Sequence, residues 1–191
     1  MSVLSDHDAR ERAITEPQNF VVTAGAGTGK TSVLVERALH LVLSGRLGIE
    51  RVAAITFTEK AATELKRRLA TALTETLARL DGHRSSPVGE ADRALERLRG
   101  AGHPDGTLKD RARTALEYLD AAFIGTLHAL AADILRRHAM AAHLPPDFAV
   151  EDELSGGLLF EEAWTRFLGN ELGHNGTRGE LWARVLRRLA P

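Results

Sequence analysis

The apolar positions of the chain fall into two patterns: short continuous runs, and longer stretches in which apolar residues recur every three to four positions. The continuous runs are typical of buried parallel strands and cover residues 19–23 (NFVVT), 51–57 (RVAAITF) and 121–124 (AAFI). The periodic stretches predict helices, and three of them follow these runs, at residues 30–43, 62–80 and 126–140. Strands that alternate with helices in this way predict an α/β fold with a parallel sheet.

Further helices and the linkers between them suggest the domain boundaries. We expect additional helices at residues 5–16, 91–98, 108–119 and 158–168, and a last one from Glu180 onward. Residues 81–106 are rich in Gly, Pro, Ser and charge around the 91–98 helix, and we interpret them as an insertion. Pro145 and Pro146 end the block that precedes them. We therefore predict one domain over residues 1–144 and the start of a second over residues 145–191.

Composition limits the class of protein without specifying its function. The 191 residues suffice for one domain with a sizeable core and the start of another. No run of about 18 apolar residues occurs, and Asp6, Asp8 and Glu11 lie where a signal peptide would be basic and then apolar. We therefore expect a soluble, cytoplasmic protein with no membrane partner. Cysteine is absent, which excludes disulfides and thiolate metal sites, and the net charge of −1 neither favours nor excludes nucleic acid.

A glycine-rich string, AGAGTGKT, directly follows the first apolar run and begins the first periodic helix. This context predicts a phosphate-binding loop for a nucleoside triphosphate, because glycines with positive φ turn backbone N–H groups inward and a helix N-terminus adds positive charge. We expect Gly25, Gly27 and Gly29 to have positive φ, Lys30 to reach the β and γ phosphates, and Thr31 to bind Mg²⁺. The predicted nucleotide-binding residues are Ala24, Gly25, Ala26, Gly27, Thr28, Gly29, Lys30 and Thr31.

Polar and aromatic side chains follow the other two apolar runs, at the carboxyl ends of strands where ligands gather in parallel sheets. They are Thr56, Phe57, Thr58 and Lys60 after the second run, and Gly125, Thr126 and His128 after the third. Exposed N–H groups at helix starts suit a phosphate and an aromatic ring suits a base, so these positions are candidates for binding a nucleic acid strand. The alternative is that Thr58 only caps its helix, Phe57 belongs to the core and His128 is structural.

The three strings AGAGTGKT, ITFTEKAATEL and IGTLHAL, in this order and each after a predicted strand, resemble motifs I, Ia and Ib of the UvrD and Rep DNA helicases of superfamily 1 and of the related RecB and AddA nuclease-helicases. The resemblance implies a RecA-like P-loop NTPase sheet with flanking helices, incomplete in this chain. It implies ATP and Mg²⁺ as cofactors, with catalytic roles for Lys30 and Thr31. Single-stranded DNA would then contact Thr56, Phe57, Thr58, Lys60, Gly125, Thr126 and His128.

The same resemblance implies a function for the whole protein. Members of the family couple ATP hydrolysis to movement along one DNA strand in the 3′ to 5′ direction, in repair or recombination. Residues 145–191 would begin the helical 1B subdomain, and a nuclease or helicase subunit is the protein partner that the resemblance suggests.

Two departures from the family pattern limit what this chain can do by itself. Relatives place a Gln that reads adenine three residues before an Ala near the N-terminus, and alignment on Ala13 puts Arg10 at that position. Hydrolysis also needs an Asp that completes magnesium binding and a Glu that activates water. Asp152 and Glu153 are the nearest match, but only three apolar residues precede them, so we interpret them as a solvated acidic loop.

We therefore expect an N-terminal fragment of a helicase, which is an enzyme at full length and has no measurable turnover alone. Two other hypotheses stay open. A P-loop phosphotransferase would give no reason for the TFTEKAA and GTLHA strings. A noncatalytic remnant that binds DNA or a partner would suit Met1 as a true start with the catalytic half missing.

Overall fold

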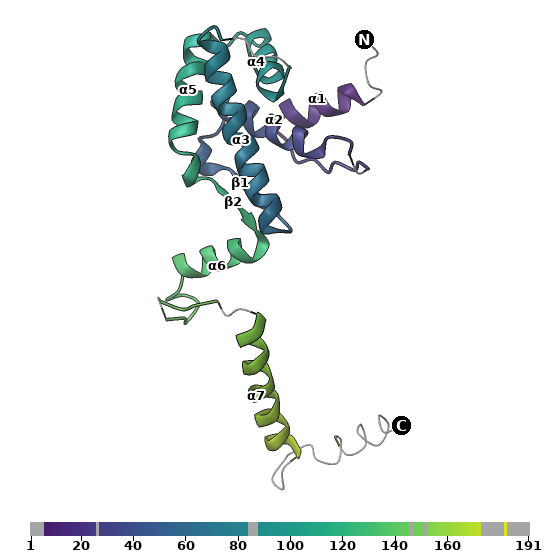
Figure 1. Cartoon of the computed structure of the whole chain (residues 1–191), viewed down its shortest axis with the longest axis vertical. Helices are drawn as coiled ribbons and strands as arrows, with labels where there is room; N and C mark the ends of the chain where they lie inside the picture. The colour runs from purple at the N-terminus through teal and green to yellow at the C-terminus, as the bar shows by residue number, and fades with distance from the viewer. Residues whose placement is uncertain are drawn as a thin grey trace. The chain divides into compact units, whose positions relative to one another are not determined.

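The two strands of the structure, β1 (Ala53–Thr56) and β2 (Phe123–Thr126), pair in parallel, with Thr56 opposite Thr126 at their carboxyl ends (Figure 1). The structure is a computed structural model that describes residues 6–25, 27–83, 88–145, 147–150, 153–172 and 182. It forms two units, residues 1–134 and 135–191. The result is a mixed α/β fold with a small parallel sheet, as the alternating pattern predicts.

Helices surround this sheet in the first unit. In chain order they are α1 (His7–Thr15), α2 (Lys30–Leu43), α3 (Glu59–Leu80), α4 (Glu90–Gly100) and α5 (Asp105–Glu117), with short 3₁₀ turns η1 (Ile49–Arg51) before β1 and η2 (Leu119–Ala121) before β2. The helix α6 (Leu127–Arg137) follows β2 directly. The long helix α3 packs along both strands and runs beside α5 (Figure 1).

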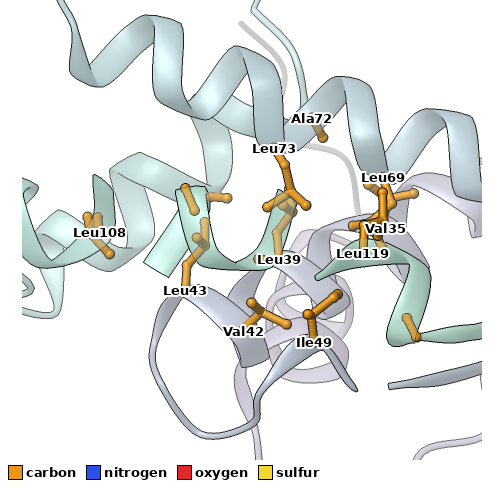
Figure 2. Packing of buried hydrophobic residues seen from close by; sticks show 14 of the residues in the cluster. Val35, Leu39, Val42, Leu43, Ile49, Leu69, Ala72, Leu73, Leu108 and Leu119 are labelled. Carbon is orange, nitrogen blue, oxygen red and sulfur yellow. The ribbon is translucent and has the colours of Figure 1, made fainter. Parts of the chain in front are cut away.

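A single apolar cluster holds α2, α3, α4 and α5 together. Leu39 of α2 and Leu73 of α3 point toward each other at its centre, and both are fully buried (Figure 2). Leu43 and Leu108 extend the cluster from α2 to α5. A smaller cluster of Ala13, Ile14 and Val33, with Phe20 against it, joins α1 to α2. The periodic residues of the helices are therefore the ones that build the core.

Most of the expected elements are confirmed, with shifts at their ends. The predicted helix 30–43 coincides with α2, and the predicted helices 62–80, 91–98 and 108–119 correspond to α3, α4 and α5. The second strand is shorter than expected because η1 occupies residues 49–51. The third begins two residues later because η2 occupies 119–121. The predicted helix 126–140 ends earlier, at Arg137 in α6.

The prediction of a strand at residues 19–23 is wrong for this structure. The segment has no assigned secondary structure, and the side chain of Val21 is 95% exposed. A strand exists only where its N–H and C=O groups meet a partner strand, and in the described residues β1 and β2 pair with each other rather than with this segment. The apolar run therefore stays exposed.

The segment interpreted as an insertion, residues 81–106, is part of the core. Its helix α4 contributes Ala94, Leu95 and Leu98 to the main cluster, all three of them buried. The sequence suggested a peripheral segment because glycine, proline and charge flank this short helix.

The second unit contains α7 (Glu153–Leu172), which includes the predicted helix 158–168. Trp164 lies between the rings of Phe160 and Phe167 on this helix, with centroid separations of 6.2 and 5.6 Å. The helix expected from Glu180 lies outside the described residues except for Trp182, and so does Asp152. No helix in the described ranges is both long and apolar enough to cross a membrane.

Candidate nucleotide and nucleic-acid site

The glycine-rich loop connects the extended segment before it to the first turn of α2. Gly27 and Gly29 have φ of 74° and 87°, as expected, and Gly29 is the residue at which α2 begins. These left-handed conformations favour glycine because they bring the Cβ of other residues too close to the backbone. The expectation is wrong for Gly25, whose φ is outside this region. Ala26 lies outside the described residues.

The side chain of Lys30 turns back over this loop. Its Nζ donates hydrogen bonds to the carbonyl oxygens of Ala24 and Gly25, at 2.7 and 2.5 Å, and the Thr28 hydroxyl donates to Gly25 O at 2.9 Å. The carbonyl oxygens occupy the place of anionic acceptors on the ammonium group. Lys30 and Thr31 are both exposed, so the loop presents an ammonium group and a hydroxyl to solvent, which suits a phosphate and its metal ion.

Arg10 of α1 lies against the same loop. Its Nη2 donates a hydrogen bond to the carbonyl oxygen of Thr28 at 2.7 Å, and a Cβ on Gly29 would lie 3.3 Å from its Nη1. The guanidinium also bonds to Asp6, one helical turn earlier, with Nε–Oδ2 and Nη2–Oδ2 both at 2.8 Å. This hydrogen bond lowers the pKa of Asp6. Arg10 therefore connects α1 to the phosphate loop.

A pocket of about 360 Å³ opens between α1 and the loop. Ala9 and Phe20 contribute apolar walls, and Thr28 and Lys30 lie at the side of the loop. Asp6 and Arg10 line it as well. The pocket thus combines apolar surface with a few placed polar groups, as small-molecule sites do.

A buried charge network holds α1 and α2 in place behind this pocket. Arg97 of α4 donates hydrogen bonds to Glu11 of α1 at 2.7–2.9 Å and to Glu36 of α2 at 2.5 Å, and Arg93 bonds to Glu36 at 2.8 Å. The side chain of Glu36 is only 6% exposed. The hydrogen bonds from Arg97 lower the pKa of Glu11. This network fixes the helix that carries Arg10 against the helix that begins at the loop.

The buried His40 of α2 lies near the same arginines. Neither of its ring nitrogens has a hydrogen-bond partner, and burial, with the positive charges of Arg46 and Arg97, lowers its pKa. Its imidazole is therefore kept neutral, as part of the packing of α2.

The carboxyl ends of β1 and β2 bring the second and third groups of candidates together. Thr56 lies opposite Thr126 in the sheet register. Each strand is followed by a threonine that caps the next helix: Thr58 Oγ1 accepts from Ala61 N and Thr126 Oγ1 accepts from Ala129 N, both at 3.2 Å. The predicted caps at Thr58 and Thr126 are confirmed.

Several candidates at this edge of the sheet are open to solvent. Phe57 is 98% exposed, so the alternative that placed it in the core is wrong. Lys60 and His128 are exposed too, whereas Gly125 and Thr126 are buried. A Cβ on Gly125 would lie 3.0 Å from the ring of Phe123, so that position has little room for a side chain. The edge therefore presents a ring, a cation and an imidazole above two threonines.

Three contacts of these sites were not foreseen from the sequence. Glu59 accepts a hydrogen bond from Thr126 Oγ1 at 2.9 Å, across 67 positions, and no local pattern reveals it. The Arg97 network is equally distant along the chain. The Asp6–Arg10 pair has the i, i+4 spacing of helix ion pairs, so that signal was available. Among the described residues, no hydrogen bond or ion pair joins the phosphate loop to the edge of the sheet.

Comparison with known proteins shows the family. The profile of the family described as UvrD/REP helicase N-terminal domain matches residues 6–181, which contain all three strings. The chain belongs to this family of helicases. The resemblance noted in the sequence is thereby confirmed, and the phosphotransferase hypothesis loses its support.

Curated relatives of this family member have one description in common, the first of the two subunit types of an ATP-dependent helicase/nuclease. The relative from Heliobacterium modesticaldum is 33% identical over 186 residues, which cover 94% of this chain and 11% of the relative. The protein of the same name from Syntrophomonas wolfei is 32% identical over 153 residues, 80% of this chain and 10% of the relative. The chain therefore spans about a tenth of the length of the relatives it matches.

Proposed function

We propose that this chain is the ATP- and single-stranded-DNA-binding N-terminal portion of a DNA helicase or translocase that moves 3′ to 5′ and serves DNA repair or recombination in the cytoplasm. The observation that carries the proposal is the UvrD/REP family match over residues 6–181. The geometry of two sites supports it, one at the phosphate loop and one at the carboxyl ends of β1 and β2.

The nucleotide site in this proposal is a P-loop of the RecA-like type. Residues 24–31 hold the phosphates through backbone N–H groups, Lys30 exchanges the carbonyl oxygens of Ala24 and Gly25 for phosphate oxygens, and Thr31 binds Mg²⁺. Phosphate oxygens carry a full negative charge, so they are stronger acceptors for an ammonium group than the two carbonyls. ATP with Mg²⁺ supplies the free energy of hydrolysis that drives movement.

The DNA site in this proposal is the edge of the sheet. Phe57 offers its exposed face to a base, since stacking on aromatic rings is tolerant of sequence. Lys60 and His128 supply positive charge or a donor beside the strand, and the N-termini of α3 and α6 suit its phosphates. The remaining contacts are assigned to Thr56, Thr58, Gly125 and Thr126.

The organisation of the whole protein follows from the same proposal. Residues 1–144 are the first part of the 1A motor domain and residues 145–191 begin the helical 1B subdomain. The residues that complete magnesium binding and activate water come from outside this chain, and a nuclease or helicase subunit is the expected partner. The relatives are named as one subunit of a helicase/nuclease, which favours that partner.

Hydrolysis of ATP by the complete gene product, with and without oligo(dT), tests this proposal. We expect stimulation by single-stranded DNA, its loss in Lys30→Ala, and no measurable turnover by the 191-residue chain alone. Turnover that DNA does not stimulate, with transfer of the phosphoryl group to a metabolite, would contradict a helicase. A robust rate from the chain alone would show that the catalytic carboxylate lies within it.

A further inference from the structure

The pocket between α1 and the phosphate loop holds one ion pair whose hydrogen-bonding capacity is only partly used. Asp6 lies at the N-cap position of α1, but its carboxylate does not cap the helix and instead accepts from Arg10. An N-terminal Asp ordinarily accepts from the backbone N–H groups of the first turn. The orientation of Asp6 is therefore set by Arg10 and the pocket rather than by the helix.

The guanidinium of Arg10 is held on one side and open on the other. Its Nε and Nη2 bond to Asp6 Oδ2, and Nη2 also bonds to Thr28 O. Among the described residues, neither Nη1 of Arg10 nor Oδ1 of Asp6 has a protein partner for a hydrogen bond. The pair thus presents an N–H donor and a carboxylate acceptor side by side, from two residues that line the pocket.

This donor–acceptor pair matches one purine better than the other. The Hoogsteen edge of adenine offers the N6–H₂ donor and the N7 acceptor, whereas that of guanine offers two acceptors, O6 and N7. A carboxylate beside a guanidinium can accept from N6 while the guanidinium donates to N7. With guanine, the same carboxylate would face O6, and two acceptors repel each other.

From this complementarity we infer that Asp6 and Arg10 together read the base of the bound nucleotide and select adenine over guanine. The inference rests on the proposed nucleotide site. The two side chains divide between them the acceptor and the donor that the single Gln of the relatives combines in one amide. Phe20 and Ala9, which line the same pocket, supply the apolar surface against which a base can pack. An arginine that merely stacked on the base would not distinguish adenine from guanine.

Competition binding to the 191-residue chain tests the inference, with Mg²⁺ present and a fluorescent ATP analogue displaced by ATP or by GTP. We expect the wild-type chain to prefer ATP by about tenfold or more, the scale of one well-placed bidentate contact. Asp6→Asn should bring this ratio close to one, because its amide can rotate to donate to O6. The same replacement on the same helix, Asp8→Asn, should leave the ratio unchanged, since Asp8 does not line the pocket.

A second variant keeps the test independent of any effect on folding. Arg10→Gln places donor and acceptor on one side chain and should retain the preference for ATP, whereas Arg10→Ala should lose it. Equal affinities for ATP and GTP in the wild type, or an unchanged ratio in Asp6→Asn, would overturn the inference while leaving the nucleotide site intact. Binding that is absent, or that Lys30→Ala does not weaken, would overturn the proposed nucleotide site and this inference with it.

Discussion

Exposed residues carry the proposed chemistry of this chain, and the backbone under them is shaped by glycine. Lys30, Thr31 and Phe57 are all exposed, yet each follows directly on a constrained turn or strand end. Gly29 is the clearest case because its φ of 87° and the nearby Nη1 of Arg10 both oppose a side chain. The conformation of one residue thus sets the start of α2 and the position of Lys30.

Replacing Gly29 by Ala is expected to destabilise the protein by about 1–2 kcal/mol, the cost of the left-handed conformation for a residue with a Cβ. Gly106→Ala is the matched control. Gly106 lies inside α5 with nothing within 4 Å of its Cβ position and no positive φ, so Ala should stabilise the helix by about 0.5–1 kcal/mol. Urea unfolding measures both, and equal effects of the two replacements would contradict this account of the loop.

At the level of elements, the sequence predicts helices better than strands in this chain. Helix α2 was predicted to the residue because a glycine with positive φ begins it and Gly45, with φ of 79°, follows its end. Each signal is local. The strand expected at residues 19–23 depends on a partner strand, which a local apolar run does not specify. The same holds for the sites: the loop, Thr58 and Thr126 were foreseen, but Glu59 and Arg97 act across distant parts of the chain.

Helix α4 is attached to α3 by an ion pair that can be titrated. Arg79 donates to both carboxylate oxygens of Asp92, at 2.7 and 3.0 Å, and Gly89 N donates to Oδ2 at 3.0 Å. The hydrogen bonds from Arg79 lower the pKa of Asp92 from 3.8 to about 2. Because the folded pKa is the lower one, this stabilisation is present above pH 3.8 and is lost as the pH falls through 2.

We therefore expect Asp92→Asn to lower the free energy of unfolding by about 1–2 kcal/mol at pH 7, and by much less near pH 2.5. Urea midpoints at the two pH values measure the difference. Asp110→Asn on the exposed surface of α5 should show no measurable change at either pH. A deficit of Asp92→Asn that is the same at both pH values would contradict the assigned ion pair.

The Arg97 network makes a second prediction about α4. Arg97→Met leaves the buried Glu36 with less compensation for its charge, so we expect a loss of about 3–5 kcal/mol. Adding Glu36→Leu removes the uncompensated charge and should restore much of that stability. Thermal unfolding of the two single variants and the double variant measures their coupling, and strictly additive effects would contradict a direct interaction between Arg97 and Glu36.

At the scale of the whole molecule, the account places two separate ligand sites in the first unit. The phosphate loop and the edge of the sheet lie on different elements, and the charge network of α1, α2 and α4 supports only the former. The chain matches about a tenth of the length of its relatives, so the coupling of the two sites belongs to the complete protein. In this chain, the two sites should bind their ligands independently.

The most direct test of that claim is a crossed binding measurement on the 191-residue chain, with Mg·ATP and a fluorescent oligo(dT) titrated in turn. Lys30→Ala should weaken ATP binding by about tenfold or more and leave oligo(dT) binding unchanged, because charge-assisted hydrogen bonds to phosphate are lost only there. Phe57→Ala should weaken oligo(dT) binding by about 1–3 kcal/mol, the scale of one stacked base, and leave ATP binding unchanged. If neither ligand binds, or if each variant weakens both ligands alike, the assignment of a nucleotide site and a DNA site to these residues is wrong.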